Sequence, residues 1–399
     1  MSRPRLALAM VVLWAGAVCA ARAACGTAVI MDADSPRGEL LDAVGLRYVR
    51  AGDPAEAISA GERGLIIVDA NPQNLKRLAG NLERVKAFGE GGGWLMLWGL
   101  TPEGLADFNR IVGVGHLIRP FEMEEVDLPR LAAERDPLIE GVSPVDVFME
   151  SGKWSGGNEE VPLRADDAWT YVVDCDDLAP FCAFPGPEYW NKENPQIGAD
   201  HYPRNMVNGL TYHWRFGFTL ILHRGEPTAW PVELPREEEI VGFSVAPCTI
   251  YHKITGMSLD FGDGKEPVEL ALKPTGERQD FVFPPRKCRK MTMGISDWQE
   301  TAKTDVVAIR NLWIVPKRSA EFYARVRPLL NIGVLVKYPV GKGGVVLNQL
   351  NVPQKERNER NVKKKRAIVS ALLQNLGATV EPLHPRAATP AARSEEAQS

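Results

Sequence analysis

The chain has 399 residues, a formal net charge of -4 and a hydrophobic fraction of 45%. This length is enough for about two domains, each with its own core. A weakly acidic chain offers no basic field to nucleic acid, so nucleic-acid binding is excluded as a leading interpretation. The one Lys/Arg cluster, within 357–366, is typical of a helix surface.

The first 23 residues have the pattern of a secretory signal. Arg3 and Arg5 precede an apolar run over 6–20, and Ala21-Arg22-Ala23 fits the small-x-small cleavage site. The run is shorter than the roughly 20 residues that a membrane-spanning helix needs. We therefore expect cleavage after Ala23, a secreted or periplasmic location, and no membrane span after signal removal.

After the signal, short apolar runs alternate with stretches of helical periodicity. Apolar positions from Leu75 to Phe88 recur at spacings of three and four, which places them on one face of a helix. The strands expected here are 28–31, 48–49, 64–70 and 94–100, and the helices are 38–44, 72–88 and one that begins at Thr101. This alternation indicates a parallel sheet covered on both faces.

Helical periodicity largely disappears between about 181 and 315. The residues there predict short strands at 217–223, 239–245, 257–261, 268–272, 280–283, 291–295 and 306–314. Asp263-Gly264 is a hairpin signal between two of them. Strands at this spacing indicate a β-sandwich or jelly roll.

The α/β pattern then returns as a hairpin of strands 334–338 and 345–350, followed by a helix over 357–376 with Gly377 beyond its end. The predicted organisation is a signal peptide at 1–23, a discontinuous α/β domain at 24–175 and 325–383, an inserted β-sandwich at 176–324, and a disordered tail at 384–399.

Three glycine-rich or apolar motifs carry a family resemblance: 91–99 (GGGWLMLWG), 136–143 (DPLIEGVS) and 341–349 (GKGGVVLNQ). In this order they resemble the class I glutamine amidotransferase-like domain that accompanies bacterial β-galactosidases and related glycoside hydrolases. The insert resembles a galactose-binding, discoidin-like jelly roll. The resemblance implies an α/β flavodoxin/amidotransferase-like parallel sheet with an inserted all-β sandwich, and a bacterial, glycoside hydrolase-associated role.

The chain departs from the enzymatic members of that family. Amidotransferase chemistry needs a Cys thiolate after the central strand, close to a His and a carboxylate. Here that strand is followed by Gly99-Leu100-Thr101, and the segment where the His is expected reads Asn348-Gln349-Leu350-Asn351. We therefore expect no catalytic residues of this kind.

Cysteines and histidines give no metal-binding spacing, and we expect no metal and no cofactor. Cys175 with Cys182, and Cys248 with Cys288, are candidate disulfides in an oxidising compartment. The alternative is that these four are buried free thiols. The scattered histidines are interpreted as surface or satisfied polar residues.

Aromatic residues in and near the insert give the positive signal for a ligand. Sugars present apolar faces that stack on aromatic rings. The candidate substrate-binding residues are Trp154, Tyr212, Trp214, Arg215 and Trp298. The alternative for Trp214 and Trp298 is that they fill the ends of the sandwich core.

The sequence therefore favours an exported, non-catalytic protein with carbohydrate as its partner, acting in binding or scaffolding. Two alternatives stay open. One is a glycoside hydrolase or divergent hydrolase with an unrecognised carboxylate pair between the domains. The other is a structural subunit that forms a homo-oligomer through its α/β domain.

Overall fold

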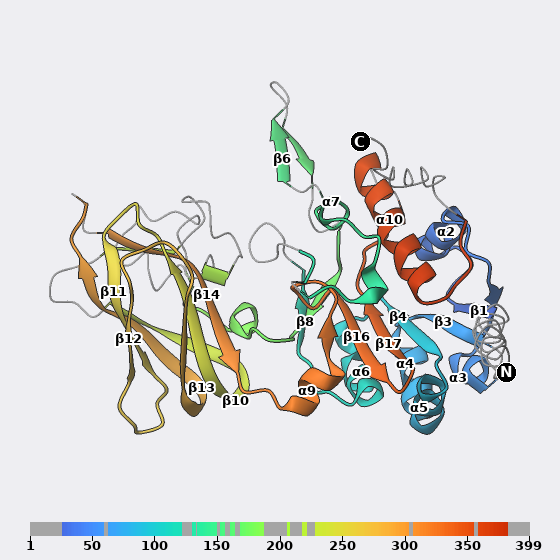
Figure 1. The fold of residues 1–399 in the computed structure, drawn as a ribbon, viewed down its shortest axis with the longest axis horizontal. Helices are drawn as coiled ribbons and strands as arrows, with labels where there is room; N and C mark the ends of the chain where they lie inside the picture. Colours follow the sequence, from blue (N-terminus) through green and yellow to red (C-terminus); the bar gives the residue numbers. More distant parts are fainter. Residues whose placement is uncertain are drawn as a thin grey trace, which may run out of the picture.

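A computed structural model describes residues 26–381, apart from 60–62, 122–129, 133, 150–151, 156–159, 164–167, 187–205, 208–217, 222–227, 303–305 and 355–357. Figure 1 shows two domains side by side, an α/β domain with helices on both sides of a sheet and an all-β domain of long strands. The signal peptide and the tail predicted from the sequence lie outside the described residues.

The α/β domain is built on a seven-stranded sheet in the order β15-β16-β17-β4-β3-β1-β2. Strands β2, β1, β3, β4 and β17 run parallel, and the hairpin of β16 and β17 adds an antiparallel edge. The strands are β1 (Gly26–Ile30), β2 (Val49–Arg50), β3 (Arg63–Asp69), β4 (Trp94–Trp98), β15 (Arg327–Pro328), β16 (Leu335–Val340) and β17 (Gly343–Asn348). The sequence predicted a parallel sheet, and the observed sheet is mixed because the hairpin of β16 and β17 joins it.

Both faces of the sheet are covered by helices and buried. Successive side chains of a strand point to opposite faces, so each strand contributes to two cores. In β3, Ile67 belongs to one hydrophobic core and its neighbour Ile66 to the other. Helices α2 (Pro36–Ala43), α7 (Pro144–Val147) and α10 (Glu359–Asn375) pack together on the first side, and α3 (Pro54–Ser59), α4 (Pro72–Ala79), α5 (Leu82–Glu90) and α6 (Leu105–Val112) on the second.

The helix expected over 72–88 is two helices, so that prediction was wrong in its extent. α4 ends at Ala79 and α5 begins at Leu82, with Gly80 and Asn81 between them. Asn81 donates its side-chain amide to the carbonyl oxygen of Arg77, 2.9 Å away. Because glycine and asparagine both weaken a helix interior, the chain turns here and keeps its apolar face on the sheet.

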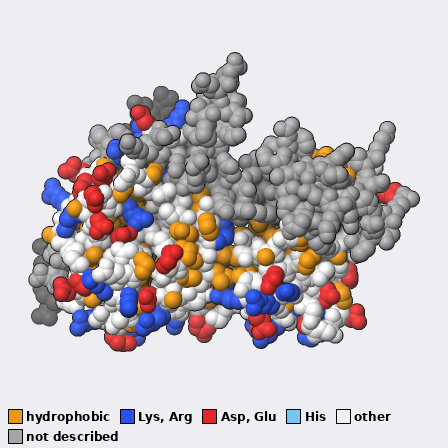
Figure 2. Space-filling view, turned by 180° about the vertical axis from the view of Figure 1, so that it is seen from behind, with side chains coloured by type: hydrophobic (Ala, Val, Ile, Leu, Met, Phe, Trp, Pro, Cys, Tyr) orange, Lys and Arg blue, Asp and Glu red, His pale blue; other side chains and the backbone are white. Residues whose placement is uncertain are grey.

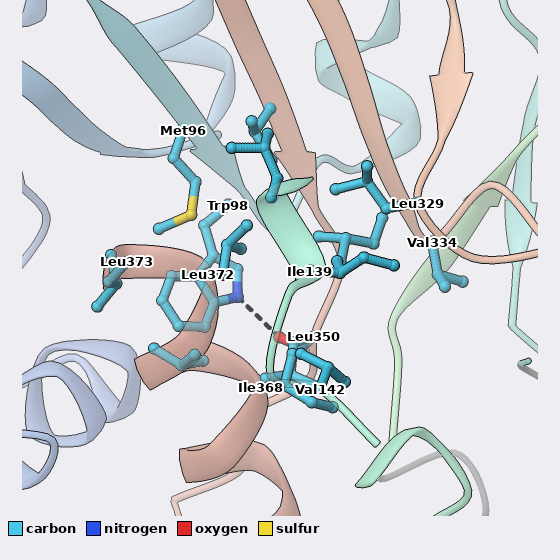
Figure 3. Close-up of a cluster of buried hydrophobic side chains, with 14 of the residues drawn as sticks. Met96, Trp98, Ile139, Val142, Leu329, Val334, Leu350, Ile368, Leu372 and Leu373 are labelled. Atoms are coloured by element: carbon cyan, nitrogen blue, oxygen red, sulfur yellow. Dashed lines mark hydrogen bonds between the residues drawn. The ribbon is translucent and has the colours of Figure 1, made fainter. Parts of the chain in front are cut away.

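The first core surrounds Trp98, the last residue of β4. Its ring is fully buried, and its Nε1 donates a hydrogen bond of 2.8 Å to the carbonyl oxygen of Leu350 (Figure 3). Ile139, Ile368 and Leu372 belong to the same cluster. This tryptophan therefore joins the central strand to the segment that follows β17.

The β domain contains a six-stranded antiparallel sheet in the order β12-β11-β13-β10-β14-β9. Its strands are β9 (Phe218–Ile221), β10 (Ala229–Pro247), β11 (Lys253–Asp260), β12 (Val268–Ala271), β13 (Gln279–Gln299) and β14 (Val306–Pro316). Asp263-Gly264 lies in the turn between β11 and β12, as predicted. An all-β domain within the α/β chain is thus confirmed at the level of secondary structure.

Strand β13 is longer than the sequence suggested, because the strands expected at 280–283 and 291–295 are parts of one strand. Pro284 and Pro285 separate the two predicted strands, and proline cannot donate to a strand ladder. The ladder with β10 shifts register there, where Ile240 pairs with Arg286 and Gly242 with Val282. The prolines therefore lie at a bulge, where the strand bends without ending.

The chain passes from the α/β domain to the β domain after β8 (Tyr171–Val173), which pairs with β5 (Ile118–Pro120). It returns after Pro316 through α9 (Ala320–Arg325), which packs against β16. Short 3-10 helices lie at Pro102–Gly104, Pro137–Ile139 and Ala179–Phe181. Strands β6 (Gly152–Ser155) and β7 (Glu160–Leu163) form a small hairpin.

A buried ionic cluster joins the two segments that connect the domains, which we call the two crossings. Asp174, only 2% exposed, accepts hydrogen bonds from Arg318 Nη2 at 2.9 Å and from the backbone N–H of Leu117 at 2.6 Å. Arg236, in β10, lies 3.5 Å from the same carboxylate and 2.5 Å from Glu238. One carboxylate therefore holds groups from both domains and both crossings. We call these four charged residues the hinge cluster.

In the described part of the chain, no helix combines the length and apolar character needed to cross a bilayer. The face shown in Figure 2 carries basic and acidic side chains interspersed, with hydrophobic atoms gathered toward the middle of the molecule. That face therefore has no large field of one sign.

Candidate functional site

A cavity of about 550 Å³ lies between the two domains, a size typical of small-ligand sites. The α/β domain contributes residues around β5, β8 and the turn before β16, and the β domain contributes β14 and the start of β13. Its lining residues of interest are Arg119, Arg130, Asn331, Asp176, Asp177, Phe181, Arg278, Asn311 and Trp313. We call this space the interdomain cavity.

Strand β14 forms the wall of the cavity on the β-domain side. Leu312 and Ile314 point into the β-domain core with no exposure, so Trp313 between them points to the opposite face and lines the cavity. The pairing with β10 shifts between Asn311 and Ile309, which leaves Arg310 as an extra residue. This bulge turns Asn311 onto the cavity face although Ile309, two residues earlier, belongs to the core.

Asn311 has an unsatisfied polar group at the cavity wall. The residue is 1% exposed, and its Oδ1 accepts the backbone N–H of Leu312 at 3.0 Å. Its Nδ2 has no hydrogen-bond partner among the described residues. A buried polar group without a partner costs about 1–3 kcal/mol, and such groups are rare in native proteins.

Arg278 is held in place beside Trp313. Its Nε donates to Asp280 at 2.7 Å, and its Nη2 donates to Ser244 at 3.1 Å. The guanidinium carbon lies 4.2 Å from the centre of the Trp313 ring, a cation–π distance. Strand pairing brings these residues together, because Ser244 of β10 is opposite Asp280 on one side and Trp313 on the other.

Two consecutive carboxylates, Asp176 and Asp177, lie on the crossing that borders the cavity. Burial raises the pKa of Asp177 to about 7, although the backbone N–H groups of Ala179 and Ile314 donate to its Oδ1 at 3.0 and 2.9 Å. Burial also raises the pKa of Asp176. Carboxyl groups with a raised pKa in a cavity mark a candidate functional site.

A second cavity of about 540 Å³ adjoins the first and shares Asp176 and Asn331 with it. Tyr323 of α9 and Arg327 of β15 line it, together with Glu134, Arg135 and Asp136. Asp136 is ion-paired with Lys337 at 2.8 Å. The two cavities therefore have part of their walls in common.

The carboxyl edge of the parallel sheet is the other place where α/β proteins commonly bind ligands. Here Arg37 forms an ion pair with Asp69 and donates to the carbonyl oxygen of Trp98 at 3.3 Å. Gly99, at φ +77°, follows β4, and a side chain there would collide with the guanidinium of Arg37. The space beside Gly99 at the end of β4 is therefore filled by this ion pair.

The aromatic candidates from the sequence fall mostly outside the described residues. Tyr212, Trp214 and Arg215 lie there, and Trp154 lies in β6, whose side chains are not described. Trp298 is partly buried, packs against the β-domain core and pairs with Ile254, and it does not line the interdomain cavity. Trp298 thus packs against the β-domain core, as the alternative interpretation of this residue expects.

The structure has all four candidate cysteines as free thiols, with Cys175, Cys248 and Cys288 buried and Cys182 partly buried. Cys175 packs in an α/β core and Cys182 against the β-domain core. Cys288 is opposite Glu238 in the ladder, whereas Cys248 follows the end of β10 ten residues later, roughly 30 Å along a strand. Burial raises the pKa of Cys288 to about 11, which keeps its thiol protonated.

Two histidines are described, and both are satisfied polar residues, as predicted for them. His116 is fully buried, with Nδ1 2.7 Å from the carbonyl oxygen of Asp174 and Nε2 2.9 Å from the hydroxyl of Tyr338. His252 accepts the backbone N–H groups of Thr301 and Ala302 at 3.1 and 3.2 Å. Among the described residues no cluster has the geometry to hold a metal ion.

No family model and no curated protein matches the chain. Among solved structures it is similar to the family 32 carbohydrate-binding module of Streptococcus pneumoniae EndoD, at 10% identity and a TM-score of 0.29, over 35% of this chain and 99% of that one. A Clostridium perfringens family 32 module in complex with GalNAc-β-1,3-galactose matches at 14% identity and a TM-score of 0.27, over 35% and 99%. The NanJ module of the same organism, in complex with galactose, has 10% identity and a TM-score of 0.27, over 35% and 97%. Likeness at this TM-score does not by itself establish a shared ligand.

The sequence did not single out Trp313, Asn311 or Arg278. Trp313 alternates with apolar core residues in β14, a pattern that also describes an ordinary solvent-facing position. Asn311 stands in an apolar strand, Ile309-Arg-Asn-Leu-Trp313, and a buried asparagine there was the one signal of an unusual position. Their common cavity depends on the second domain lying opposite, which no local pattern encodes.

Proposed function

We propose that this protein binds carbohydrate in the interdomain cavity, with Trp313 as the ring platform. The observation that carries the proposal is the pairing of an aromatic ring with fixed polar groups. Trp313 lies against the anchored guanidinium of Arg278, and the unsatisfied amide of Asn311 lines the same wall. Sugars offer apolar C–H faces together with hydroxyl donors and acceptors, so this mixture suits them.

A glycan array on the chain, followed by calorimetric titration of the hits, tests the proposal. Trp313→Ala is expected to weaken binding at least about tenfold, which corresponds to roughly 1.4 kcal/mol. Trp298→Ala is the matched control, because it removes a tryptophan of the same sheet that does not line the cavity. Equal losses for the two variants, or binding by neither variant nor parent, would refute the cavity as a sugar site.

A hydrolytic role is the second candidate, and Asp177 is the observation in its favour. One oxygen of this carboxyl group is anchored by two backbone N–H groups, and its pKa is raised to about 7, as a general acid requires near neutral pH. Release of reducing ends from an array hit, lost in Asp177→Asn but kept in Asp107→Asn, would establish it, because Asp107 is paired with Arg110 away from the cavity. Binding without any cleavage would leave the binding role alone.

The remaining expectations are part of the same proposal. We infer export, with residues 1–23 removed, and mass spectrometry of the protein recovered from cells tests whether the mature chain begins at Ala24. We also infer that the α/β domain has a flavodoxin-like, amidotransferase-related topology, supported by the parallel order β2-β1-β3-β4-β17, and that the insert is a jelly roll. In this proposal the α/β domain is a scaffold, and light scattering tests whether it forms a homo-oligomer.

A further inference from the structure

The interdomain cavity is lined by more basic than acidic side chains. Three arginines face two aspartates. Guanidinium groups stay protonated throughout the accessible pH range, whereas burial raises the pKa of Asp177 to about 7, so this carboxyl group is only partly ionised at neutral pH. Because Arg278 is already ion-paired with Asp280 at 2.7 Å, the positive excess of the cavity is small and depends on the partial protonation of Asp177.

The hydrogen-bonding groups at the cavity wall include more unused donors than unused acceptors. The buried amide nitrogen of Asn311 has no hydrogen-bond partner among the described residues, and the amide oxygen of Asn331 accepts the backbone N–H of Arg130 at 2.7 Å. Arg278 has its Nε and Nη2 occupied by Asp280 and Ser244, and its Nη1 makes no bond to a described residue. A ligand richer in acceptors than in donors fits such a wall better than a neutral sugar, whose hydroxyls offer both.

Arg130 forms no ion pair among the residues that the structure describes. Its backbone is fixed by a pair of bonds with Asn331, from Arg130 N to Asn331 Oδ1 and from Asn331 N to Arg130 O at 2.9 Å. Its side chain is exposed at the cavity and forms no ion pair with the rest of the described chain. By contrast, the hinge cluster satisfies its own arginines with Asp174 and Glu238.

We propose that the ligand of the interdomain cavity is an anionic sugar, with its ring on Trp313 and its carboxylate or sulfate group bound by Arg130. This inference rests on the proposed carbohydrate-binding function and specifies its ligand class. A planar carboxylate can accept two parallel N–H bonds from one guanidinium, and a sulfate presents a similar set of oxygens. The ring contact distinguishes an anionic sugar from a simple inorganic anion, which Trp313 would not favour.

Matched methyl glycosides that differ only at C6 test the inference by calorimetry: galactoside with galacturonide, glucoside with glucuronide, and mannoside with mannuronide, plus a 6-sulfated galactoside. The anionic member of the bound pair is expected to bind at least about tenfold more tightly at low salt. Arg130→Gln should remove that preference and leave the neutral sugar's affinity within about twofold. Arg289→Gln, which removes an exposed arginine that is 3.7 Å from Glu233 on the surface, is the control and should keep it.

The outcomes separate the two proposals. If neutral and anionic members bind equally, the anionic preference is overturned while carbohydrate binding stands. If no glycoside of either kind binds, both fail. Preference for the sulfated galactoside over the uronides identifies sulfate as the source of the charge, and preference for a uronide identifies the carboxylate. A preference that survives in Arg130→Gln overturns the assignment of Arg130.

Discussion

The carboxyl edge of the parallel sheet and the interdomain cavity are two polar regions with opposite character. At the sheet edge Arg37 and Asp69 satisfy each other and occupy the space beside Gly99. Among the described residues that line the cavity, the amide nitrogen of Asn311 has no hydrogen-bond partner and Arg130 forms no ion pair. The sheet edge, where the sequence resemblance suggested a site, is thus filled by the chain's own side chains. The interdomain cavity, which no sequence motif marks, has polar groups without a partner among the described residues.

The largest expected effect separates the two regions by stability. Trp98→Ala removes a fully buried ring and its hydrogen bond to Leu350, and it should lower the free energy of unfolding by about 3–5 kcal/mol. Chemical denaturation measures this loss. Where the variant remains folded, sugar affinity should be unchanged because Trp98 does not line the cavity. A stability loss below about 1 kcal/mol would contradict the central role given to this ring.

A smaller effect is expected when the ion pair at the sheet edge is broken. Asp69→Ala leaves the partly buried guanidinium of Arg37 without its partner and should cost about 1–2 kcal/mol of unfolding free energy. Binding of sugars should remain at the parent level. A marked loss of sugar affinity in this variant would mean that the sheet edge, and not the cavity, holds the ligand.

A pH dependence is expected from the cavity. The pKa of Asp177 is raised to about 7, above its unfolded value, so the folded state holds this proton more tightly. Stability from this group is therefore present at acidic pH and declines as pH rises toward 7. Asp177→Asn keeps an oxygen that can accept from Ala179 and Ile314, and should raise the unfolding free energy by about 1–2 kcal/mol at pH 8 with little change at pH 3.5. Thermal unfolding at the two pH values checks the sign.

The smallest stability change is expected at Asn311. In Asn311→Leu the unsatisfied amide is removed but the bond from the Leu312 N–H is lost too, so the unfolding free energy should stay within about 1 kcal/mol of the parent. Sugar affinity should nevertheless fall about tenfold. A strongly destabilised variant would show that this amide serves the fold, and full retention of binding would show that it does not touch the ligand.

The elements of the α/β domain were largely predictable because their patterns are local. The continuous apolar runs of β3 and β4, which are buried on both faces, and the helical spacing from Leu75 onward are both visible in the sequence. Errors arose where one or two residues decide the outcome: Gly80 and Asn81 divide a helix, whereas Pro284 and Pro285 sit in a bulge and do not divide β13. In the helix the local preferences of Gly80 and Asn81 outweigh the longer periodicity, whereas in β13 the pairing with β10 outweighs the local rule against proline.

The candidate site was much less predictable. Trp313 faces the cavity only because Arg119, Arg130 and Asn331 of the other domain lie opposite it. The bulge at Arg310 that turns Asn311 outward is set by pairing with β10, more than 60 residues earlier. A single sequence carries the alternation of β14 but not the orientation of the two domains, and the site depends on that orientation.

The position of β17 has a consequence for how the molecule assembles. Strand β17 pairs with β4, so Gly344 meets Trp94 across an interval that contains the whole β domain. Contacts this distant in sequence form slowly, because the intervening chain must first be brought together. If the insert folds first, the contact between Arg318 and Asp174 brings its two ends together and shortens the loop that separates β4 from β17. Until residues 343–348 emerge from the ribosome, β4 is an unpaired apolar edge, and we expect the nascent chain to be most prone to aggregation at this stage.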